Sequence, residues 1–124
     1  MITRDKDLFP EDETGDNLWH LLNQGCDLNQ IFEIEFSMIF PTQQQALAFA
    51  QILLENNQKI SFTPYDAHPS HNWEITAYPS MPLNYQTLTG YQALLVTHAE
   101  PESGLFDGWY CPEVADYLPD ENVN

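Results

Sequence analysis

The chain has very few basic residues: three lysines and arginines stand against 19 aspartates and glutamates in 124 residues, a formal net charge of −16. A field of this sign repels phosphate backbones, so we expect no direct binding to nucleic acid. A basic protein surface is a more natural partner. The same acidity can also serve only to keep a small protein in solution.

Cysteine is equally scarce. Cys26 and Cys111 make no disulfide framework, and we expect both to be reduced and to act as small packing residues. No apolar run approaches the length of a membrane span, and no signal-peptide pattern opens the sequence. These absences predict a cytoplasmic protein.

Signatures of catalysis are missing as well. The chain has no Gly-rich phosphate loop, no nucleophile elbow and no Cys-x-x-Cys pair. His68 and His71 flank a short Pro-Ser turn, but a zinc site needs three or four protein ligands and this set is incomplete. A pairing of Cys111 with His98 has no local signature. We therefore predict no catalytic residue, no metal site and no cofactor.

The apolar content, by contrast, is that of an ordinary globular chain. Apolar residues make up 43% of the sequence and aromatic residues 13%, which is enough for one hydrophobic core. We predict an acidic N-terminal lead-in at 1–15, a single αβ domain at 16–112 and an acidic C-terminal tail at 113–124.

The clearest local pattern is the alternation in FEIEFSMIF, residues 32–40. Apolar residues occupy one face of this predicted strand, and Glu33 and Glu35 lie on the other. Shorter alternations predict strands at 59–65 and 72–79, which can form a hairpin.

Three segments predict helices, at about 16–24, 43–56 and 85–98, from apolar residues that recur every three or four positions. Thr42 and Asn84 precede the second and third segments and are good N-cap residues.

The segment GLFDGWYCPEV, residues 104–114, can supply a last strand. Regular alternation would send Leu105, Asp107, Trp109 and Cys111 one way and Phe106 and Tyr110 the other. The order then predicts an α+β fold, the ferredoxin-like βαββαβ two-layer sandwich. In this fold two helices cover one face of a four-stranded antiparallel sheet, here with a short additional N-terminal helix.

Carboxylates on the other face of that sheet are the candidate functional groups. Glu33 and Glu35 project from one strand and Glu74 from another. They can form a docking surface for a basic partner, an acid/base pair, or simply the solvated side of an amphipathic sheet.

Several stretches, taken together and in order, resemble a known family. They are FPEDETGDNLWHLL, GCDLNQIFEIEFSMIFPTQQQALAFAQ, NWEITAYPSMPLNYQTLTGYQALL and DGW, and they span about residues 9 to 110. They resemble the regulator of ribonuclease E activity B (RraB) family. The resemblance implies a ferredoxin-like fold and a non-catalytic protein that inhibits ribonuclease E. Such a protein binds the enzyme's carboxy-terminal scaffold region and alters RNA turnover without cutting RNA.

The family's Asp-Gly-Trp motif matches Asp107, Gly108 and Trp109, although Tyr110 stands where glycine usually follows. The motif can serve binding, or it can serve the fold through a bulge and packing. Two alternatives to the regulator remain, a small-molecule-binding or enzymatic domain on the same fold and a homodimer paired through sheet edges. We predict a protein-binding set of five residues: Glu33, Glu35, Glu74, Asp107 and Trp109.

Overall fold

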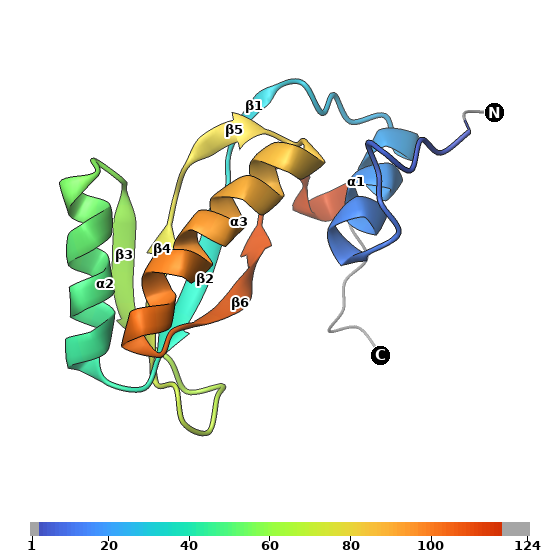
Figure 1. Cartoon of the computed structure of the whole chain (residues 1–124). Helices are drawn as coiled ribbons and strands as arrows, with labels where there is room; N and C mark the ends of the chain where they lie inside the picture. The colour runs from blue at the N-terminus through green and yellow to red at the C-terminus, as the bar shows by residue number, and fades with distance from the viewer. Residues whose placement is uncertain (1–2, 118–124) are drawn as a thin grey trace.

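The computed structural model describes residues 3–117 and confirms the predicted α+β sandwich (Figure 1). Four antiparallel strands form one sheet in the order β3–β4–β2–β6, and the connectivity β2-α2-β3-β4-α3-β6 is the predicted βαββαβ. The strands of this sheet are β2 (Glu35–Phe40), β3 (Ile60–Pro64), β4 (Trp73–Ala77) and β6 (Leu105–Tyr110).

Helices and shorter elements complete the described part of the chain. A two-stranded sheet extends the main sheet at one end. One 3-10 helix follows the last α-helix and a second follows the last strand. These elements are α1 (Glu13–Asn23), α2 (Gln43–Glu55), α3 (Tyr85–Ala99), β1 (Ile31–Glu33), β5 (Ser80–Pro82), η1 (Glu100–Glu102) and η2 (Pro112–Tyr117).

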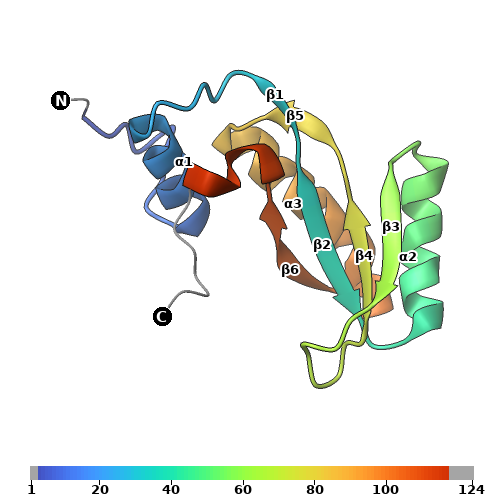
Figure 2. The same cartoon turned by 180° about the vertical axis from the view of Figure 1, so that it is seen from behind.

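Both long helices cover the same face of the sheet. Phe40 packs on Phe49 of α2 with ring centroids 5.0 Å apart, and Phe36 packs on Tyr91 of α3 at 4.9 Å. Phe36 and Phe40 are four residues apart, so they lie on the same side of β2, and both are fully buried. Figure 2 shows the opposite face of the sheet, over which no helix of the described residues lies.

Capping side chains set the starts of the helices. Thr42 and Asn84 cap α2 and α3 as predicted. α1 begins three residues before its predicted start, because the Asp12 carboxylate accepts a 2.7 Å hydrogen bond from the backbone N–H of Gly15. Sequence reasoning missed this cap because the first turn of α1 has no apolar periodicity.

The predicted strand 32–40 is divided in the structure at Ile34. The N–H of Ile34 donates to the carbonyl of Pro79 at 2.8 Å, and the register between the two chain segments is the same on both sides of this break. Side chains therefore alternate across the break as in one strand. Glu33 and Glu35 lie on the same face, as predicted.

β6 departs from the prediction because it contains a bulge. Phe106 pairs with Met38 and Gly108 pairs with Ser37, so Asp107 is an extra residue between them. Gly108 has a φ of 129°, a backbone conformation that favours glycine.

The extra residue reverses the alternation of the strand beyond it. Trp109 pairs with Phe36 and shares its helix-facing side, whereas Tyr110 pairs with Glu35 on the opposite side, where Leu105 also lies. The regular alternation predicted from the sequence, with Trp109 on the same side as Leu105, is therefore wrong.

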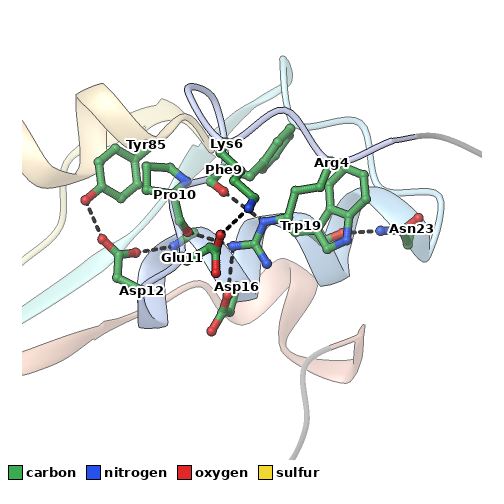
Figure 3. Close-up of polar contacts among 11 residues, drawn as sticks. Arg4, Lys6, Phe9, Pro10, Glu11, Asp12, Asp16, Trp19, Asn23 and Tyr85 are labelled. Carbon is green, nitrogen blue, oxygen red and sulfur yellow. Dashed lines mark hydrogen bonds and ion pairs between the residues drawn. The ribbon is translucent and has the colours of Figure 1, made fainter.

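The segment before α1, residues 3–12, is called the N-terminal strap below. Arg4 holds it in place by donating to the carbonyls of Phe9 at 2.9 Å and Pro10 at 2.7 Å and by pairing with Asp16 at 2.8 Å (Figure 3). The Pro10 carbonyl lies so close to Gly15 that a Cβ at this position would be 1.8 Å from its oxygen. The docked strap therefore requires a glycine here.

We expect Gly15→Ala to lower the free energy of unfolding by about 1–3 kcal/mol, because the added methyl group collides with backbone atoms. Gly90→Ala is the matched control, since Gly90 is helical and a Cβ there meets no atom within 4 Å. This second change is expected to stabilise the protein by about 0.5–1 kcal/mol. Urea unfolding of both variants checks the prediction, and equal losses of stability would contradict it.

Candidate functional site

Figure 2 shows the sheet face opposite α2 and α3, which we call the open face. The strand register assigns mostly polar side chains to it. Residues paired across antiparallel strands share a face, so the register assigns each side chain to one side. The open face comprises Glu33, Glu35, Ser37, Ile39, Lys59, Ser61, Thr63, Glu74, Thr76, Tyr78, Leu105 and Tyr110, of which Ile39 is almost fully buried.

Hydroxyl groups form the floor of this face. Ser37 Oγ lies 3.4 Å from Thr76 Oγ1, and Ser61 Oγ lies 2.8 Å from the phenol oxygen of Tyr78. Within the described residues, every buried side-chain polar atom has a hydrogen-bond partner. The floor is thus a fixed polar surface rather than an apolar pocket with a few unpartnered catalytic groups.

Three carboxylates gather on the open face. Burial is the main reason that the pKa of Glu74 is raised, followed by the negative charge of Asp107, and Glu35 adds a smaller contribution of the same sign. Burial, together with the neighbouring Asp107 carboxylate, also raises the pKa of Tyr65. Asp107 therefore lies close to Glu74 although the bulge takes it out of register. We call Glu35, Glu74 and Asp107 the acidic trio.

Glu33 lies on the same face, but its charge is compensated. Its carboxylate pairs with Lys59 Nζ at 3.1 Å, and this ammonium group also lies 5.3 Å from the ring centroid of Tyr78. Arg4 and Lys6, the only other basic residues of the chain, are paired with nearby acids at 2.8 and 2.6 Å. No basic side chain is therefore left to neutralise the acidic trio.

Trp109 lies apart from the other four predicted residues. It is half-buried on the helix-facing side of β6, where it pairs with Phe36 and contacts the core. The structure thus brings Glu33, Glu35, Glu74 and Asp107 together on one face. Alternation in the sequence indicated the three glutamates, whereas Asp107 was indicated by the family motif.

The remaining reactive side chains of the described residues form no site. Burial raises the pKa of both Cys26 and Cys111, which keeps the thiols protonated. His71 Nε2 bonds the carbonyl of Ser103 at 2.9 Å, and His68 Nδ1 accepts backbone N–H groups of its own turn. In residues 3–117 no group of three or more His, Cys, Asp and Glu side chains could hold a metal ion. The same residues include no helix long and apolar enough to cross a membrane.

Neutralising Glu74 is expected to stabilise the protein at neutral pH. Its pKa is raised in the folded state, so the folded chain holds the proton more tightly and stability falls as pH rises through this range. We expect Glu74→Gln to raise Tm by a few degrees at pH 7. The gain should vanish well below the ordinary glutamate pKa of about 4.3. Glu55→Gln on α2, outside the open face, is the control and should leave Tm nearly unchanged.

Comparison with known proteins gives one family. The family model RraB, described as regulator of ribonuclease activity B, matches residues 11–111. This range includes the whole of α1, α2 and α3 and every strand of both sheets. None of the curated proteins compared with the chain matches it. Since the match extends over most of the 124 residues, the chain belongs to the RraB family, whose members are non-catalytic regulators of ribonuclease E.

Proposed function

We propose that this protein regulates ribonuclease E by binding a basic segment of the enzyme's carboxy-terminal region on its open face. Family membership supports the target enzyme. The observation that carries the choice of surface is the acidic trio, Glu35, Glu74 and Asp107. The one basic side chain on this face, Lys59, is paired with Glu33, and no helix of the described residues covers the face.

Mutual repulsion within the trio favours a cationic partner. The raised pKa of Glu74 means that its ionised form is destabilised by burial and by the charges of Asp107 and Glu35. A lysine or arginine side chain placed among these groups would relieve the repulsion and gain charge-assisted hydrogen bonds. Binding is then expected to lower the pKa of Glu74 and to release protons near its titration range.

The regulator acts without cutting RNA in this proposal. Its net charge of −16 disfavours contact with the RNA itself, so its effect on cleavage comes through the enzyme. Occupying a basic scaffold segment removes that segment from its other contacts and slows RNA turnover. The protein then works in the cytoplasm, where ribonuclease E acts.

Binding to the purified carboxy-terminal half of ribonuclease E from the same organism tests the proposal. We expect saturable binding whose affinity falls as salt concentration rises, because exposed charges dominate the encounter. Calorimetric titration at low and at high salt measures this directly. An affinity independent of salt would argue against docking on the open face.

Pairing of two copies through sheet edges is less well supported. The N–H of Tyr65 donates to the carbonyl of Asn72 at 2.7 Å, which sets the phase of the β3–β4 ladder and directs Pro64 toward the outer edge. Pro64 has no N–H to donate there, and the bulge at Asp107 and Gly108 breaks the spacing of the β6 edge. We infer a protein that does not extend its sheet by self-pairing.

A further inference from the structure

A cavity of about 150 Å³ lies between the N-terminal strap, α1, the loop at Leu28 and Asn29 and the start of α3. Its apolar lining includes Leu8 and Phe9 of the strap, Leu18 of α1 and Leu83 just before α3. Leu18 and Leu83 are almost fully buried, whereas Leu8 is 61% exposed and so lies at the mouth. An apolar cavity of roughly this volume holds one benzene molecule. The site therefore has room for one aromatic or branched aliphatic group.

The wall of this cavity is held in a defined position. Phe9 packs on Trp19 with ring centroids 5.3 Å apart, and the hydroxyl of Tyr85 donates to the Asp12 carboxylate (Figure 3). These contacts add to the hydrogen bonds from Arg4 that fasten the strap. The cavity is thus a built feature, fixed at both ends of the strap, and not a gap beneath a loose segment.

The surroundings of the cavity are strongly acidic. Residues 3–16 carry six acidic and two basic side chains, and both basic side chains, Arg4 and Lys6, are already paired within this segment. Asp7, which is exposed, belongs to the cavity lining itself. An occupant therefore needs an apolar group for the interior and positive charge around it.

We propose that this cavity binds one aromatic or aliphatic side chain of a basic polypeptide segment, as an anchor for a partner that the acidic surface attracts. The inference rests on the proposed function for the basic character of the partner. Apolar burial then supplies short-range affinity and selectivity among basic segments, which charge alone does not distinguish. The cavity and the open face are separate sites with separate tests.

Two short Lys/Arg-rich peptides that differ only in a central Phe or Ser provide the probe. We expect the Phe peptide to bind about tenfold more tightly, as burial of an aromatic side chain predicts. Fluorescence anisotropy of labelled peptides measures both values of Kd. Backbone amide shifts in the strap and at the start of α3, seen by NMR with the Phe peptide alone, would locate the ring. Equal affinities for the two peptides would overturn the proposal.

Leu8→Asp separates apolar from electrostatic binding. This change adds an acid at the mouth of the cavity, so purely electrostatic binding would strengthen for both peptides. The proposal predicts instead that the preference for Phe is lost. Leu54→Asp on α2 is the matched control, because Leu54 is 56% exposed and lies outside the cavity. Leu54→Asp should keep the tenfold preference for the Phe peptide. If Leu8→Asp kept this preference as well, the cavity would not be the site that binds the Phe side chain.

The same variants distinguish this inference from the proposed function. If the carboxy-terminal half of ribonuclease E binds wild type and Leu8→Asp equally well and the peptides show no preference, the cavity proposal fails and the regulator proposal stands. If that half does not bind while the Phe preference persists and depends on Leu8, the partner is wrong and the cavity site stands. Thermal unfolding checks that Leu8→Asp is folded, and we expect a Tm close to that of the wild type because Leu8 is exposed.

Discussion

Replacing Phe36 by aspartate is expected to leave the protein unfolded at room temperature. Phe36 is fully buried near the start of β2, and its ring lies 4.9 Å from that of Tyr91 and 6.4 Å from that of Phe106. The change removes the aromatic packing and places a carboxylate in an apolar core. Loss of the buried ring costs about 3–5 kcal/mol and an unpaired buried carboxylate about 3–5 kcal/mol more, and the sum matches most of the roughly 5–15 kcal/mol total stability of a domain. Circular dichroism on heating should show no cooperative transition.

Glu35→Lys is the control at the adjacent position. Glu35 lies on the open face, where a lysine side chain can remain solvated. We expect a folded protein with a Tm close to that of the wild type. Equal melting behaviour of the two variants would contradict the assignment of helix-facing and open sides of β2.

Removing the negative charge of the open face is expected to abolish binding of the partner. In the triple variant Glu35→Lys, Glu74→Gln and Asp107→Lys the trio that attracts a basic segment becomes positive. We expect affinity for the carboxy-terminal half of ribonuclease E to fall by about a hundredfold or more, since each close charge pair contributes substantially. Calorimetric titration at low salt gives the largest difference between variant and wild type.

A second triple variant controls for net charge. Asp27→Asn, Glu55→Lys and Glu100→Lys change the total charge by the same amount at exposed positions outside the open face. We expect these changes to weaken binding only slightly, through long-range attraction that salt screens. Equal losses in the two triple variants would show that overall charge, and not the open face, determines binding.

Local patterns in the sequence predicted most of the fold. Alternation identified β2, β3 and β4 and the faces of β2, and the caps at Thr42 and Asn84 marked the starts of α2 and α3. β5 was missed because Ser80–Pro82 is too short to alternate and ends in proline. The bulge at Asp107 was missed because an extra residue is defined by its partner strand and leaves little trace in its own sequence.

The candidate site shows the same division between local and long-range information. Alternation placed Glu33, Glu35 and Glu74 on the solvated face, but could not show that Glu33 is neutralised by Lys59, 26 residues away in the chain. Trp109 entered the predicted binding set through a motif, and the bulge turns it toward the helices. The cavity under the strap combines four separate chain segments, so no local pattern announces it.

RNA cleavage by purified ribonuclease E, with and without this protein, tests the central claim most directly. The assay should be run at low and high salt, on the full-length enzyme and on an enzyme lacking its carboxy-terminal half. The account predicts slower cleavage by the full-length enzyme, relief of this inhibition at high salt, no effect on the shortened enzyme and no cleavage by the regulator alone. Unchanged cleavage by the full-length enzyme at tens of micromolar regulator, or equal inhibition of the shortened enzyme, would contradict it.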